Sequence, residues 1–195
     1  MNTRPFASII SILFHPMIIS LVAFYLLLFD GCVLLNYNAA KVLMVCFIFS
    51  NLIPIITVLI LKKIGKISDL DASNKEQRFL PLTLGIVYSG IAFLMLTYMK
   101  ADPLVRGLMF CYMTNTLMTI IITKYWKISI HAMGVAEPLA ALWIAGFQFP
   151  LIAIAILVSV SYSRVLLKAH TGLQVTAGSI AGFVLTYGQL YFFFI

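Results

Sequence analysis

Residues 7–29 read ASIISILFHPMIISLVAFYLLLF, an apolar run with no Asp, Glu, Lys or Arg. A bilayer core about 30 Å thick needs roughly 20 apolar residues per helical crossing, so this run is long enough for one. Similar runs cover residues 40–61, 80–99 and 107–122; two shorter ones flank residues 146–150, and a last one covers 171–195. The sequence predicts an all-α, polytopic transmembrane bundle of six or seven helices, in a single domain over residues 1–195.

The composition favours the same class. The chain has 195 residues, 63% of them hydrophobic and 10% charged, whereas soluble domains carry about 25% charged residues. Its net charge is +7, from basic residues in short loops, which commonly set topology or meet anionic headgroups. We expect an integral multi-pass protein of a bacterial inner membrane that contacts membrane lipids and no nucleic acid. Cys32, Cys46 and Cys111 are expected to be buried thiols.

Several polar residues and a small-residue motif lie inside the apolar runs. Asn51 and Asn115 are expected to form hydrogen bonds across helices. His15 is expected either to bond a neighbouring helix or to lie near a functional site, and Glu137 either to serve such a site or to pair structurally. Residues 178–182 read GSIAG, and small residues four apart favour close helix packing within the bundle.

The most informative polar stretch is SYSRVLLKAHTGLQVTAG, residues 161–178. Arg164 and Lys168 offer the charge and hydrogen-bond donors that phosphate oxygens bind. His170 can act as a nucleophile, acid or base near neutral pH, and Gln174 lies four residues further on, on the same face of a helix that begins there. The stretch predicts a phosphate site beside a reactive histidine.

Counting crossings brings more residues to this site. Arg78, His131 and the pair Arg164 and His170 each lie where an apolar run meets the membrane surface. Two runs separate Arg78 from His131, and two separate His131 from Arg164. Because an even number of crossings returns the chain to the same side, all four are expected at one face of the membrane.

At these residues the chain resembles the type 2 phosphatidic acid phosphatase superfamily. That family's third motif has Ser-Arg, five residues, His, three residues and Asp. Here Ser163-Arg164 is followed by five residues, His170, three residues and Gln174 in place of the aspartate. The resemblance covers about residues 62–182.

The other two motifs are matched less closely. Pro-Ser-Gly-His corresponds to residues 128–131, which keep Ser129 and His131. In the motif of a lysine with Arg-Pro, Arg78 matches the arginine, Phe79 replaces the proline, and Asp71 stands at the lysine position.

The resemblance implies a lipid phosphatase without cofactor or metal, in which His170 forms a phosphohistidine and His131 protonates the leaving alcohol. Gln174 would orient His170 without supplying the charge of an aspartate. A slow enzyme, a divergent one with a substitute carboxylate such as Glu137, and an inactive one remain open. Arg78, Ser129 and Arg164 would hold the phosphate. Lys75 or Lys168 would supply the positive charge that is lost because Asp71 stands at the lysine position of the first motif.

Three functions are therefore considered. The first is hydrolysis of a lipid phosphate such as phosphatidate, phosphatidylglycerol phosphate or a polyprenyl diphosphate. The second is a catalytically silent relative that binds lipid phosphates or scaffolds membrane partners, and the third is a small transporter with a proton path through His15, His131 and His170. The resemblance implies a periplasmic site, whereas the distribution of Lys and Arg favours a cytoplasmic one.

Overall fold

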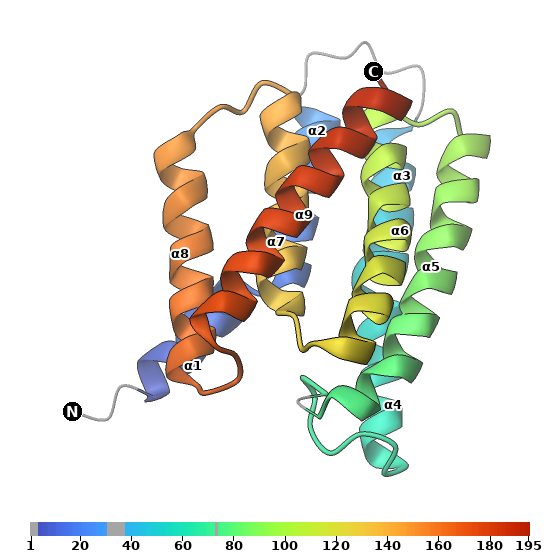
Figure 1. Ribbon diagram of the computed structural model, residues 1–195. Helices are drawn as coiled ribbons and strands as arrows, with labels where there is room; N and C mark the ends of the chain where they lie inside the picture. The colour runs from blue at the N-terminus through green and yellow to red at the C-terminus, as the bar shows by residue number, and fades with distance from the viewer. Residues whose placement is uncertain (1–3, 31–37, 73) are drawn as a thin grey trace.

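The computed structural model describes residues 4–30, 38–72 and 74–195, and within them every regular element is helical (Figure 1). The elements are, in order, α1 (Arg4–Leu13), α2 (Pro16–Phe29), α3 (Ala39–Phe47), the π-helical turn η1 (Ile48–Leu52), α4 (Ile53–Lys63), the 3₁₀ turn η2 (Lys75–Arg78), α5 (Phe79–Tyr98), α6 (Pro103–Tyr125), α7 (Ile130–Ile144), α8 (Pro150–Leu166) and α9 (Gly172–Phe193). The all-α prediction is confirmed for these residues.

Four helical segments of the described chain are long and apolar enough to cross a membrane: Pro5–Phe29, Ala39–Lys63, Lys75–Tyr98 and Pro103–Tyr125. Ile130–Ile144 and Pro150–Leu166 are apolar but shorter, as expected for the two short runs around residues 146–150. Large apolar side chains cover the outside of the bundle; Leu94, Leu151 and Phe192 are 67%, 82% and 77% exposed. An outer surface of this kind suits a lipid environment, while six or seven crossings stay a prediction.

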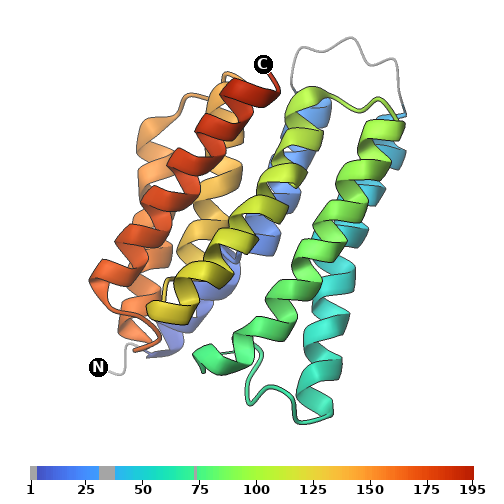
Figure 2. The same cartoon turned by 45° about the vertical axis from the view of Figure 1, so that its right-hand side comes forward.

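Helices α2 and α6 lie in the middle of the bundle. In Figure 2, α7, α8 and α9 lie on one side of them, and α3, α4 and α5 on the other. The α4–α5 loop, the α6–α7 turn and the α8–α9 turn all lie at the lower end in Figure 1. This end carries the residues of the candidate site, and α1 reaches it by packing against α8.

The first apolar run breaks at His15 and Pro16. Pro16 has no backbone N–H and fixes its own φ, so it begins a helix easily and cannot continue one. His15 is the N-cap of α2, and its Nδ1 accepts a hydrogen bond from the Met17 backbone N–H at 3.3 Å. The break therefore holds the His15 side chain at the lower end of the bundle.

Polar contacts inside the bundle are concentrated between α6 and α9. Asn115 donates to Thr186 Oγ1 at 2.9 Å, and Gln189 donates to Asn115 Oδ1 at 2.8 Å, which confirms the expected bond across helices. The expectation for Asn51 is wrong. Asn51 donates to Ser50 Oγ at 2.7 Å within its own π-helical turn, because that turn brings the adjacent hydroxyl within reach. Cys46 and Cys111 are free and buried, as expected, and Cys32 lies outside the described residues.

The close packing of α7 on α9 depends on two glycines. A Cβ atom at Gly178 would lie 2.6 Å from the Ser129 carbonyl oxygen, and one at Gly182 would lie 2.5 Å from the Met133 carbonyl oxygen. Both neighbours are backbone atoms of the α7 segment, so a side chain on α9 could not be accommodated by a rotamer change. The small-residue prediction for packing within the bundle is confirmed.

This packing predicts that Gly182→Ala destabilises the protein. The α7 and α9 backbones would have to separate, and overpacking of this kind costs about 1–3 kcal/mol of unfolding free energy. Gly188 is the matched control on the same helix, because a Cβ there meets nothing within 4 Å. Gly188→Ala should be neutral or stabilising by up to about 1 kcal/mol. Thermal unfolding in detergent measures both, and equal effects would contradict the packing argument.

Candidate functional site

A cavity of about 200 Å³ opens at the lower end of the bundle. Its polar wall is formed by His15, Asp71, Arg78, His131 and His170. These side chains come from the α1–α2 break, the α4–α5 loop, η2, the first turn of α7 and the α8–α9 turn. The structure thus brings together, at one end, residues that the crossing count assigns to one face.

The spacing between Arg164 and His170 follows from how α8 ends. Lys168 has φ 55° and its N–H donates to the Val165 carbonyl at 2.9 Å, while the Ala169 N–H donates to the Arg164 carbonyl at 3.0 Å. These two bonds form a Schellman motif, the usual termination of a helix by a left-handed residue. The His170 N–H also donates to the Arg164 carbonyl, at 3.3 Å. The helix end therefore fixes His170 relative to Arg164.

Gln174 determines which His170 nitrogen is protonated. Thr171 and Gln174 form a capping box at the start of α9, in which the Thr171 backbone N–H donates to Gln174 Oε1 at 3.1 Å. A backbone N–H can only donate, so the Gln174 atom that faces it is the oxygen. The same oxygen lies 3.1 Å from His170 Nδ1, which must then carry the proton. His170 Nε2 keeps its lone pair.

His170 is buried, with 7% of its surface exposed. Burial lowers the pKa of His170 to about 4, and the nearby positive charge of Arg78 acts in the same direction. The hydrogen bond to Gln174 opposes this shift but does not cancel it. His170 is therefore uncharged at neutral pH, the form in which an imidazole nitrogen can act as a nucleophile.

Arg78 joins the α4–α5 loop to the α6–α7 turn. It is 3% exposed. Its Nε donates to the Ala72 carbonyl at 2.8 Å, and its Nη1 donates to the Ile128 carbonyl at 3.2 Å. These two bonds hold the planar guanidinium in the cavity wall, where its charge acts on His170.

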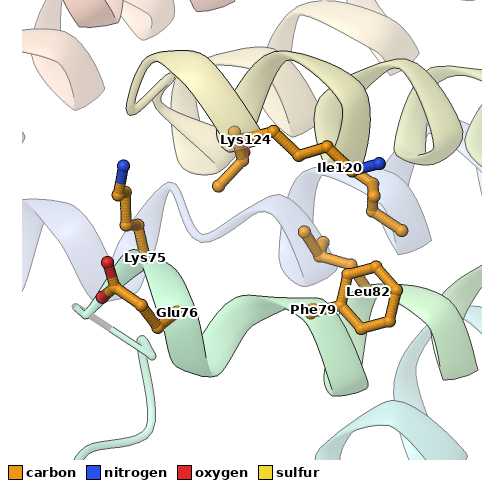
Figure 3. A pocket seen from close by; sticks show the side chains of 7 residues that line it. Lys75, Glu76, Phe79, Leu82, Ile120 and Lys124 are labelled. Atoms are coloured by element: carbon orange, nitrogen blue, oxygen red, sulfur yellow. The ribbon is translucent and has the colours of Figure 1, made fainter.

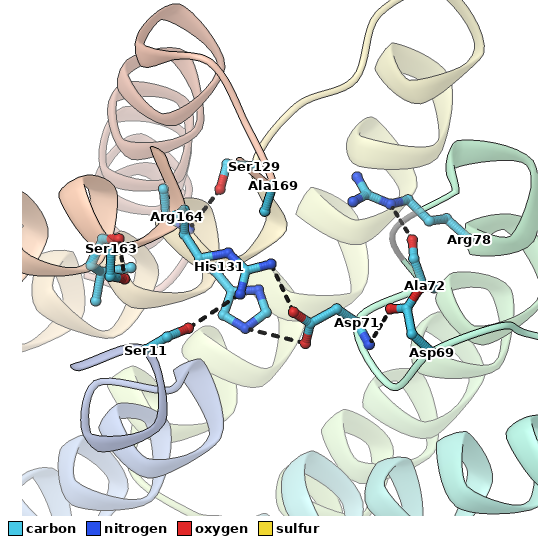
Figure 4. A network of polar contacts seen from close by, with 12 residues as sticks. Ser11, Asp69, Asp71, Ala72, Arg78, Ser129, His131, Ser163, Arg164 and Ala169 are labelled. Carbon is cyan, nitrogen blue, oxygen red and sulfur yellow. Dashed lines mark hydrogen bonds and ion pairs between the residues drawn. The ribbon is translucent and has the colours of Figure 1, made fainter. Parts of the chain in front are cut away.

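Asp71 forms the central ion pair of the site (Figure 4). Its Oδ2 accepts from Arg164 Nη2 at 2.8 Å, and its Oδ1 lies 3.9 Å from His131 Nε2. Arg164 Nη1 donates to Ser11 Oγ of α1 at 3.2 Å. Burial raises the pKa of the Asp71 carboxyl, but Arg164 and His131 outweigh burial and hold that pKa below its ordinary value. Asp71 is therefore negatively charged at neutral pH.

His131 lies between His15 and Asp71. Its side chain is 13% exposed, and the two imidazole rings meet edge to face, with centroids 4.9 Å apart. Of the two interpretations of His15, the one that places it near the site agrees with this contact. Glu137, two turns further along α7, lines a different cavity of about 230 Å³. Asp71, and not Glu137, is therefore the carboxylate that lies close to a histidine of the site.

Four residues predicted to bind phosphate do not line this cavity. Arg164 is buried behind its wall and reaches it through the bond to Asp71. Ser129 is fully buried, and its Oγ caps α7 by accepting from the Ala132 N–H at 3.4 Å. Lys75 lines a separate cavity of about 290 Å³, together with Lys124 of α6 (Figure 3). Lys168 is exposed and forms the left-handed residue that ends α8.

The helix-ending role of Lys168 predicts a stabilising substitution. A side chain at positive φ costs about 1 kcal/mol relative to glycine, so Lys168→Gly should raise the unfolding temperature in detergent and leave phosphate affinity unchanged. Lys100, with φ 54° after α5, is the matched control, and Lys100→Gly should behave alike. A loss of phosphate affinity in Lys168→Gly alone would show instead that Lys168 binds phosphate.

Sequence reasoning did not identify Lys127 and Ser11 as members of the site. Lys127 Nζ donates to the Ala169 carbonyl at 2.9 Å and so joins the α6–α7 turn to the α8–α9 turn. Burial and the charges of Arg78 and Arg164 lower the pKa of Lys127. Its position two residues before Ser129 is a usable signal, because the Ile128 carbonyl and His131 of the same motif reach the site. Ser11 lies on an apolar helix and gave no such signal.

Within the described ranges, no three His, Cys, Asp or Glu side chains are grouped so that they could hold a metal ion. Comparison with known proteins gives no match: no family model, no curated protein and no solved structure matches the chain.

Proposed function

We propose that the protein is a membrane-embedded phosphatase that hydrolyses a lipid phosphate through a phosphohistidine. The observation that carries the proposal is the uncharged His170, whose Nδ1–H is held by Gln174 and whose Nε2 is available. Arg78 and Arg164 supply fixed positive charge near it, and the resemblance of residues 161–178 to the phosphatase motif adds support. Phosphoryl transfer depends mainly on positioning and on stabilising spread negative charge.

Two steps follow from this arrangement. In the first, His170 Nε2 attacks phosphorus, the bond to the lipid oxygen breaks, and protonated His131 gives its proton to that oxygen. Burial and Arg164 lower the pKa of His131 in the free protein, and the negative charge of the bound phosphate, like that of Asp71, favours the protonated form that this step requires. In the second, water attacks the phosphohistidine, His131 takes a proton from the water, and the N–P bond breaks to release phosphate. Both histidines return to their starting forms. A lipid substrate suits a site at the end of an apolar bundle, because the tail can stay in the bilayer.

Purified protein assayed for phosphate release from phosphatidate, phosphatidylglycerol phosphate and a polyprenyl diphosphate tests the proposal. His170→Ala should lower release by at least about 10³-fold, since loss of a nucleophile removes the covalent route. Lys75→Gln is the control and should retain activity, because Lys75 lines the separate cavity. Equal release by wild type and His170→Ala would exclude the mechanism.

The pH below which activity falls gives a second test, through a substitution at Gln174. Gln174→Glu places a carboxylate against His170 Nδ1, which stabilises the imidazolium and raises its pKa by about 1 or more. The neutral nucleophile would then be lost at a higher pH, so the acid limb of the pH–rate profile should move upward from about 4. Arg78, Lys127 and Arg164 also act on His170 and oppose its protonation.

Gln148→Glu, in the exposed turn between α7 and α8 at the other end of the bundle, is the matched control. It adds the same charge and should leave the limb in place. An unchanged acid limb in Gln174→Glu would show that His170 does not set it.

A catalytically silent phosphate-binding protein is the second candidate function. It is favoured by the Asp71–Arg164 ion pair, which engages one of the two site arginines, and by the uncharged Gln174 beside His170. This candidate requires no phosphate release by the wild type, together with thermal stabilisation by phosphate that Arg164→Gln abolishes.

A further inference from the structure

Asp71, which lines the cavity, already occupies one donor of the buried Arg164 side chain. The 2.8 Å bond joins Arg164 Nη2 to Asp71 Oδ2, and Nη1 is engaged by Ser11. Arg164 Nε is enclosed and has no hydrogen-bond partner among the described residues. Nη2 is therefore the donor over which a carboxylate and an incoming phosphate would compete.

The Asp71 side chain can leave this position without unfolding its loop. The side chain is 38% exposed, so it has space on its outer side. The backbone beside it is held separately, by the Asp71 N–H bond to Asp69 Oδ1 at 3.0 Å and by the Arg78 bond to the Ala72 carbonyl. A change of side-chain rotamer could therefore uncover Arg164 while the loop stays in place.

We propose that Asp71 determines the affinity and charge preference of the site: it competes with the substrate phosphate for Arg164 and favours lipids with one phosphate over lipids with a diphosphate. This inference rests on the proposed function and narrows its substrate class. After displacement the carboxylate still lies close to the bound phosphate. Its repulsion grows with the charge of the ligand, which is larger for a diphosphate than for a monophosphate.

Asp71 also has the opposite charge to the lysine that the sequence resemblance implies at this position. A lysine at position 71 would add a positive charge and attract the more highly charged ligand. Aspartate changes the charge at that position by two units in the opposite direction and places it within 3.9 Å of His131. A carboxylate displaced from Arg164 can turn to His131. The negative charge of Asp71 would then have a partner in His131, the residue proposed to protonate the leaving oxygen.

Calorimetric titration of the full chain in detergent at pH 8, with inorganic phosphate and with pyrophosphate as probes, tests this inference. Asp71→Asn should bind phosphate about threefold to tenfold more tightly than wild type, the range expected from removing a partly exposed ionic competitor. It should bind pyrophosphate more tightly by a larger factor. Asp71→Lys should extend both changes in the same direction.

Glu76→Gln is the matched control, because it removes the same charge from the same loop while Glu76 lines the separate cavity. It should leave both affinities nearly unchanged. The effect of Asp71→Asn should also be smaller in an Arg164→Gln background, because the competition acts through that residue. Unchanged or weaker phosphate binding in Asp71→Asn, an equal gain for both anions, or an equal gain in Glu76→Gln would overturn the inference.

The two proposals fail separately. Absence of phosphate release from every lipid, together with the expected shifts in Asp71→Asn, would reject the phosphatase and keep Asp71 as the competitor in a binding site. Hydrolysis of lipid phosphates by a protein in which Asp71→Asn shifts neither affinity would reject the role of Asp71 alone.

Discussion

The site depends on the backbone contact between α7 and α9. Gly178 and Gly182 let the α9 backbone lie against the carbonyl groups of Ser129 and Met133. The Ser129 N–H also donates to the Gln174 carbonyl at 3.3 Å, which fixes the two segments along their axes. Since His131 lies in the first turn of α7 and His170 precedes α9, this contact sets where the two histidines lie in the cavity wall. A separation of the helices would move the proposed acid away from the proposed nucleophile.

Electrostatic balance is the second constraint on the site. In the phosphatase motif that the chain resembles, an aspartate stands at the position of Gln174. The acidic group of this site is Asp71, which contacts Arg164 and His131 instead. An amide beside His170 still fixes the tautomer but leaves its pKa low. A carboxylate beside Arg164 offsets a positive charge that has little access to solvent. Relative to the motif that the chain resembles, negative charge therefore lies beside the proposed phosphate-binding arginine and the proposed acid, and not beside the proposed nucleophile.

The sequence predicted those features that depend on local pattern. Apolar run length located the long helices, and a helix was expected to begin near His170, where α9 starts at Gly172. The break at His15-Pro16 was not predicted, because the apolar pattern continues through residues 7–29 without interruption. The ion pair of Asp71 with Arg164 could not be predicted, because residues 64–72 have no hydrophobic periodicity. Arg78 holds this loop through its bonds to Ala72 and to Ile128, the latter 50 residues away in sequence. Lys75 was misplaced for the same reason: it lies one helical turn from Arg78 but faces a different cavity.

Several polar residues at or beside the site also cap or close a helix. His15 and Ser129 are N-caps, Arg164 accepts the bonds that close α8, and Gln174 completes a capping box. In an apolar bundle the unpaired backbone groups are concentrated at helix ends, and polar side chains are stabilised there because they satisfy those groups. The same ends hold side chains at fixed positions on packed helices. A polar site of defined geometry therefore arises at the end where the α1–α2 break, the α4–α5 loop and two helix–helix turns meet.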